Sequence, residues 1–187
     1  MIHDPKLLDL LSAFDPIEFG SEVFRATRKS LDPLTPSTSG GRWAQKDGPA
    51  VLYMSTERDG ALAEIAFHWS QFYPLPSKPA ALHRIGLTAR RTIRLLRADL
   101  VDLGVDWARY GEMGYERSQA IGAAVAFLEC DGLLAPSARW SCETVVLFLE
   151  NHANRLEVLD TEAVDWLTWA RANDLLAPEN RDHSAED

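Results

Sequence analysis

The apolar run at residues 145–149 (VVLFL) is the strongest constraint on the fold. An uninterrupted apolar run of this length is typical of a strand buried in the middle of a sheet. Less apolar segments with strand character are predicted along the rest of the chain, at 22–27, 50–55, 80–87, 92–96 and 156–159. We therefore expect residues 145–149 to form a central strand flanked by strands from distant parts of the sequence.

Helical spacing of apolar residues predicts four helices, at residues 5–14, 58–71, 115–129 and 161–176, the last with Thr161 as its N-cap. Strands and helices are mixed without a regular βαβ alternation, which favours an α+β fold. The 187 residues fit one domain. We predict a single domain over 1–187, with a core at about 20–160, an N-terminal helix at 5–14, a C-terminal helix at 161–176 and a polar tail at 178–187.

The charge and the apolar pattern exclude several classes of function. A net charge of −9 argues against general binding of nucleic acid, whose phosphates favour an excess of Lys and Arg. No apolar run is long enough to cross a bilayer, and the N-terminus lacks the basic start of a signal peptide. Cys130 and Cys142 lie in apolar surroundings, as buried reduced thiols do. We expect a cytoplasmic protein with no membrane contact.

Arg25 and the loop at 30–48 carry the first polar groups that packing alone does not require. Arg25 ends an apolar strand, and because a buried guanidinium is costly it needs a partner carboxylate or an anionic ligand. The loop is rich in Pro, Ser, Thr and Gly and contains the segment SGGRW. Gly41 would let the backbone approach a ligand, Arg42 adds a cation and Trp43 a flat wall. A plain turn is the alternative.

Tyr53 and Glu64 form the second group of polar residues. Tyr53 and Ser55 face the same side of a strand, because side chains alternate there. Glu64 lies on a helix in apolar surroundings, so it is either paired with an arginine or retained for chemistry. His68 follows four residues later on the same helix face. Two such ligands without a third do not define a metal site, and we predict none.

Ser137 lies in the turn-like segment PSAR and lacks the G-x-S-x-G setting of a hydrolase nucleophile. A structural serine is the simplest interpretation of this segment taken alone. A triad of Ser137 with a glutamate and either His68 or His83 is formally possible, but nothing in the sequence orders those residues.

These segments, taken in order, resemble the RES-domain family, which is named for an arginine, a glutamate and a serine. The motifs read FRAT, GGRW, YMS, ALAE, PSAR and VLF, at 24–27, 40–43, 53–55, 61–64, 136–139 and 146–148. The resemblance covers about residues 20–160. The sequence departs from the family pattern at Ala44, where an Asn is common after the Trp, and at Glu143 and Thr144, where an Asn is common before the last strand.

The resemblance implies a toxin of a toxin–antitoxin pair, with a fold like that of the ADP-ribosyltransferases of the diphtheria-toxin type. Its partner would be an Xre-type helix-turn-helix antitoxin that covers the active site. Such a toxin degrades NAD⁺ by cleaving the nicotinamide–ribose bond, through hydrolysis or phosphorolysis. It needs no cofactor, with NAD⁺ as substrate and inorganic phosphate as a potential co-substrate.

The resemblance also implies roles for the site residues. Glu64 would stabilise the positive charge that grows on the ribose. Arg25 and Arg42 would bind the pyrophosphate, and Tyr53 would contact the nicotinamide. The catalytic set is Glu64, Arg25, Tyr53 and Ser137, and the substrate-binding set is Arg25, Gly41, Arg42, Trp43, Tyr53, His68 and Ser137.

Two alternatives remain open from the sequence. The first is an ADP-ribosyltransferase that uses the same site to modify a protein target. The second is a non-catalytic protein that binds a regulator through its Trp-rich last helix and through a run of arginines, namely Arg90, Arg91, Arg94 and Arg97.

Overall fold

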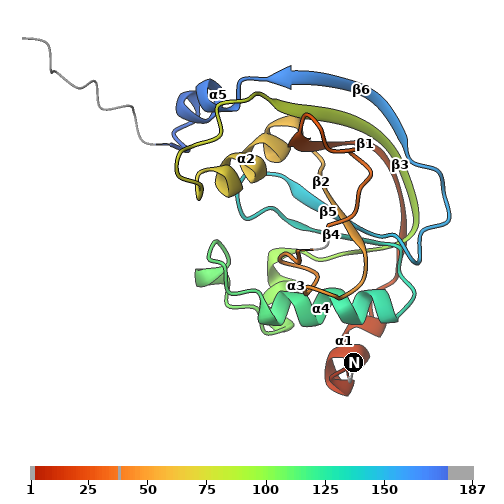
Figure 1. Ribbon diagram of the computed structural model, residues 1–187. Helices are drawn as coiled ribbons and strands as arrows, with labels where there is room; N and C mark the ends of the chain where they lie inside the picture. Colours follow the sequence, from red (N-terminus) through yellow and green to blue (C-terminus); the bar gives the residue numbers. More distant parts are fainter. Residues whose placement is uncertain (1–2, 38, 177–187) are drawn as a thin grey trace, which may run out of the picture.

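A strongly curved sheet forms the centre of the computed structural model (Figure 1), which describes residues 3–37 and 39–176. The predicted tail at 178–187 lies outside the described residues. Within these residues the sheet has six strands in the order β1-β2-β5-β4-β3-β6. They are β1 (Ile17–Arg28), β2 (Val51–Ser55), β3 (Ala80–Arg94), β4 (Gly132–Pro136), β5 (Glu143–Phe148) and β6 (Glu157–Val164).

The apolar run at 145–149 lies in and just after β5, as predicted. β5 is flanked by β2 and β4, both antiparallel to it, and Val145, Val146 and Leu147 are almost fully buried. The two segments predicted at 80–87 and 92–96 form one strand, β3, because pairing with β1 continues through the polar residues between them. β4 was not predicted as a strand, and it pairs in parallel with the end of β3.

The curvature of the sheet follows from the pairing of β1 with both β2 and β3, which closes five of the strands into a ring. Residues of β3 pair with β1 on one side and with β6 on the other, while its last residues pair with β4. Five strands share a cluster of buried apolar residues, which includes Val23, Leu52, Ile85, Leu134 and Leu147. Burial of this cluster favours the curled sheet over a flat one.

The helices cover opposite ends of the sheet (Figure 1). At one end are α1 (Pro5–Ser12), α3 (Arg97–Asp102), η1 (Trp107–Arg109) and α4 (Glu116–Phe127), and at the other are α2 (Arg58–Trp69) and α5 (Trp166–Ala172). The α+β architecture predicted from the sequence is confirmed. Among the described helices, none is long and apolar enough to span a membrane.

The C-terminal helix is shorter than the predicted range of 161–176. Residues up to Val164 extend β6, and Asp165 caps α5 by accepting a hydrogen bond from the backbone N–H of Thr168 at 3.2 Å. The prediction of Thr161 as the N-cap is therefore wrong. Acidic residues followed by apolar ones fit an exposed edge strand as well as a helix, so the pattern did not separate the two structures.

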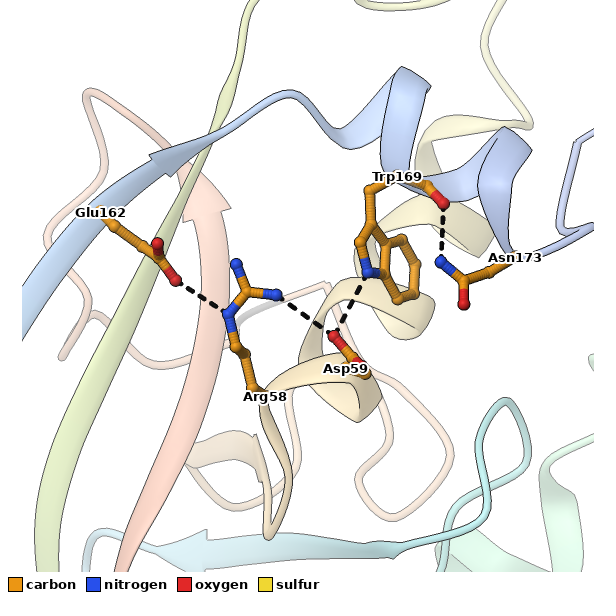
Figure 2. A network of polar contacts seen from close by, with 5 residues as sticks. All are labelled: Arg58, Asp59, Glu162, Trp169 and Asn173. Carbon is orange, nitrogen blue, oxygen red and sulfur yellow. Dashed lines mark hydrogen bonds and ion pairs between the residues drawn. The ribbon is translucent and has the colours of Figure 1, made fainter.

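The first turn of α2 is fixed to β6 and α5 by a polar network (Figure 2). Arg58 donates from Nε to Glu162 at 2.9 Å, and its NH1 donates to Asp59 at 3.2 Å. The indole N–H of Trp169 also donates to Asp59, at 3.2 Å, while the Trp169 carbonyl accepts from Asn173 at 2.8 Å. The helix that carries Glu64 is thus anchored at its start.

His83 connects three strands and gives the fold a predicted dependence on pH. Its ring nitrogens contact the hydroxyls of Thr27 on β1, at 2.9 Å, and Thr161 on β6, at 2.8 Å. Burial lowers the pKa of His83 below 6.5, Arg25 lowers it further, and Asp32 opposes this. Just below pH 6.5, His83 therefore binds more protons in the unfolded chain than in the folded one. We expect the free energy of unfolding to fall as the pH is lowered through that window.

Urea denaturation between pH 5 and pH 7 measures this effect. The variant His83→Gln has no titrating group at this position, so its unfolding free energy should depend less steeply on pH than that of the wild type. An equal slope in both proteins would contradict the assignment to His83, whatever the absolute stability of the variant.

Candidate active site

A cleft of about 330 Å³ lies between α2, β2 and the loop that precedes β2. Its volume is within the range of small-molecule sites. Of the site residues predicted from the sequence, all except Ser137 line the cleft directly: Arg25, Gly41, Arg42, Trp43, Tyr53, Glu64 and His68. Segments far apart in the chain are therefore brought together as expected.

Glu64 is the carboxylate of this cleft, and Ser137 holds it. The Ser137 hydroxyl accepts backbone N–H bonds from Arg139 at 3.1 Å and Trp140 at 3.3 Å. Its single proton is then donated to Oε1 of Glu64 at 3.3 Å. Within the described residues, Oε2 of Glu64 accepts no hydrogen bond. The geometry orients the carboxylate through Ser137 and leaves one oxygen available to a ligand.

Tyr53 supports the GGRW loop through a hydrogen bond and through packing of its ring. Its hydroxyl accepts the backbone N–H of Trp43 at 3.1 Å, and burial is the main reason that its pKa is raised to about 12. Gly41 packs on the Tyr53 ring so closely that a Cβ would lie 2.8 Å from the hydroxyl. The Trp43 side chain is only 1% exposed and belongs to the core. We therefore expect Trp43 to anchor the loop rather than to stack on a ligand.

Arg25 has neutral partners instead of the carboxylate that the sequence left open. Its guanidinium donates to the carbonyls of Pro33 and Thr35, both at 2.9 Å. Burial lowers its pKa to about 10, against the opposing charge of Asp32. Arg25 thus stays charged at neutral pH, fixes the start of the loop and contributes positive charge to the cleft.

Arg139 and Tyr115 also line the cleft, and sequence reasoning did not place them there. The Arg139 guanidinium lies 3.3 Å from the centre of the Phe67 ring and donates to the carbonyl of Gly111 at 2.6 Å. Burial lowers the pKa of Arg139, whereas Glu64 raises it. Arg139 could have been suspected from its place in the PSAR motif, but no sequence signal singled out Tyr115.

His68 lies at the rim of the cleft, one turn of α2 beyond Glu64. Desolvation lowers its pKa, Glu64 raises it, and the cations of Arg139 and Arg42 lower it again. His68 makes no hydrogen bond to Ser137 within the part of the chain that the structure describes, and His83 is committed to two threonines. Neither histidine therefore forms a triad with Ser137.

The positions that depart from the family pattern have structural roles of their own. The carbonyl of Ala44 accepts the N–H of Gly41 at 2.8 Å and closes the loop. Glu143 forms an ion pair with Arg94 at 3.0 Å, and Thr144 lines the cleft. Across residues 3–37 and 39–176, no group of three His, Cys, Asp or Glu side chains could hold a metal ion.

The fold and the cleft define an α+β domain with one carboxylate held among several arginines. The chain belongs to the RES-domain family, because residues 22–170 match the RES domain. The fold is accordingly of the ADP-ribosyltransferase-like type expected from the resemblance.

A chain in the crystal structure of the M. tuberculosis MbcT–MbcA toxin–antitoxin complex has a similar fold, with a TM-score of 0.79. The two are 19% identical, over 90% of this chain and 97% of that one. No curated protein sequence matches the chain.

Proposed function

We propose that this protein is the toxin of a toxin–antitoxin pair and that it cleaves the nicotinamide–ribose bond of NAD⁺. The observation that carries the proposal is the Glu64 carboxylate, oriented by Ser137 in a cleft that Arg25, Arg42 and Arg139 make positive. Membership of the RES family and the fold shared with a chain of a toxin–antitoxin complex support it.

The chemistry needs a fixed negative charge and little acid–base catalysis. As the bond from the ribose carbon to nicotinamide breaks, its electron pair leaves with the nicotinamide, which departs as a neutral molecule. Positive charge then grows on the ribose. Glu64 stabilises that charge through its free oxygen, and because Ser137 holds the other oxygen, little reorganisation is required.

The acceptor oxygen completes the reaction. With water, an oxygen bonds to the ribose carbon, a proton is released, and the product is ADP-ribose. With inorganic phosphate, a phosphate oxygen forms that bond, and the product is ADP-ribose-1″-phosphate. The two routes use the same carboxylate, so they differ only in what reaches the ribose.

The remaining residues of the cleft bind the substrate in this proposal. Arg25 and Arg42 contact the pyrophosphate, whose oxygens match the planar guanidinium. The Tyr53 ring contacts the nicotinamide, with His68 at the rim. No cofactor takes part. An Xre-type helix-turn-helix antitoxin covers the cleft in the inactive pair, and the pair is cytoplasmic.

The test is to incubate the purified protein, freed of any partner, with NAD⁺ in the presence and absence of phosphate. Chromatography then follows nicotinamide and the ribose product. Nicotinamide release is expected, and its absence in every condition would contradict the proposal. Phosphate-dependent ADP-ribose-1″-phosphate identifies phosphorolysis, ADP-ribose identifies hydrolysis, and a labelled protein band would favour transfer to a protein target.

A further inference from the structure

Arg42 is held in the cleft in an unusual way. Its guanidinium carbon lies over the rings of two tyrosines, 4.5 Å from the centre of Tyr110 and 4.7 Å from that of Tyr115. Within the described residues, the Arg42 side chain makes no ion pair and donates no hydrogen bond. Within these residues, the guanidinium is therefore held by cation–π contacts with the two tyrosine rings.

This arrangement differs from that of a structural arginine. A cation–π contact engages the face of the guanidinium and leaves the N–H donors around its edge unused. Arg25 differs from Arg42, because two of the Arg25 N–H groups already donate to loop carbonyls and only the remaining ones are available to a ligand. The N–H donors of Arg42, which are the atoms that recognise phosphate oxygens, thus stay available. The orientation of the guanidinium is already fixed by the rings.

Tyr110 is a rigid support for Arg42. Its side chain is buried, its ring stacks on that of Trp107 at 4.6 Å, and its hydroxyl donates to the carbonyl of Pro136 at 2.8 Å. Burial raises the pKa of Tyr110, so the phenol remains a neutral donor. Because Pro136 precedes Ser137, the segment that orients Glu64 also fixes the ring beneath Arg42.

Tyr115 is the second support, and it faces the cleft itself. It immediately precedes α4, and Gln119 on that helix donates to the carbonyl of Gly41 at 2.9 Å. Residues 115–119 therefore hold two parts of the loop. Gln119 binds the loop backbone next to Arg42, and Tyr115 contacts the Arg42 side chain.

We propose that Tyr110 and Tyr115 are positioning residues that hold the Arg42 guanidinium with its N–H donors available for a diphosphate group. The identity of the natural ligand as a dinucleotide rests on the function proposed above. The positioning itself does not, and inorganic pyrophosphate serves as the probe.

Calorimetric titration with pyrophosphate at constant ionic strength tests the positioning. We expect Tyr115→Phe, which keeps the ring, to bind within about twofold of the wild type, and Tyr115→Leu to bind about five- to tenfold more weakly. The Tyr115 hydroxyl also interacts with Arg139, and Tyr115→Phe removes that contact as well. In an Arg42→Gln background, Tyr115→Leu should therefore cause no greater loss than Tyr115→Phe, because the cation that the ring positions is gone.

Three results would overturn the proposal: a wild type that does not bind pyrophosphate, a Tyr115→Leu variant that binds as tightly as the wild type, or, in the Arg42→Gln background, a loss from Tyr115→Leu that exceeds the loss from Tyr115→Phe as much as it does in the wild type. The NMR resonance of the Arg42 Nε–H group provides a ligand-free check. It should be shifted upfield by the rings in the wild type and in Tyr115→Phe, and less so in Tyr115→Leu; equal shifts in all three would also count against the proposal. If this pattern holds but no nicotinamide is released, only the proposed function fails.

Discussion

Glu64→Gln is expected to slow nicotinamide release from NAD⁺ by about a hundredfold to a thousandfold, or more, while the protein remains folded. The change removes the negative charge that stabilises the ribose cation but little volume. The amide oxygen can still accept the hydrogen bond from Ser137, so the local structure should be kept. The rate constant kcat should fall much more than KM rises, because the carboxylate acts mainly in the transition state. Steady-state kinetics and thermal unfolding measure the two parts of this result.

Glu57→Gln is the matched control for that experiment. Glu57 is exposed, immediately precedes α2 and makes no side-chain cap to the helix. The same chemical change there should leave both kcat and the unfolding temperature as in the wild type. If Glu64→Gln retained more than about a tenth of the wild-type rate, Glu64 would not have the role assigned to it.

The substitution Gly122→Ala is expected to lower the free energy of unfolding by about 3 kcal/mol. Gly122 lies on α4 against the GGRW loop, and an added Cβ would overlap the backbone carbonyl of Trp43. The loop cannot move aside easily, because Tyr53 and Gln119 hold its backbone. The variant should also release nicotinamide more slowly, since Arg42 would be displaced with the loop. Urea denaturation and the NAD⁺ assay measure these effects.

Gly20→Ala provides the comparison for Gly122→Ala. A Cβ at this exposed position of β1 would find its nearest neighbour, the Thr88 hydroxyl, at 3.9 Å. The stability should therefore change by less than about 0.5 kcal/mol. Gly122→Ala unfolding at the same urea concentration as the wild type would show that α4 and the loop are not in close contact.

The sequence predicted the parts of this fold that depend on local patterns. The apolar run at 145–149 and the helical spacing around Glu64 each reflect a single element and its buried face. The parallel pairing of β4 with β3 and the strand at 161–164 depend on which distant segment lies alongside, and no local pattern reports that. The boundary of α5 was misplaced for the same reason.

The same distinction holds for the cleft. The residues that line it were predicted because their motifs occur in the order of a known family. The contacts that orient them could not be predicted in this way. These contacts join segments that are remote along the chain. Ser137 contacts Glu64, and Arg42 lies over the rings of Tyr110 and Tyr115. Arg25 was expected to need a carboxylate or an anionic ligand, and the sequence did not indicate that two backbone carbonyls would also accept from its guanidinium.

The anchoring of the loop by Arg25, Tyr53 and Gln119 has a consequence for how a ligand binds. A loop tied to three other segments loses its conformational entropy when the chain folds, not when the ligand arrives. The cleft is thus preorganised, and most of the contact energy can appear as affinity. An antitoxin that covers such a cleft would need only to block entry, because the site beneath it would be complete as soon as the partner is removed.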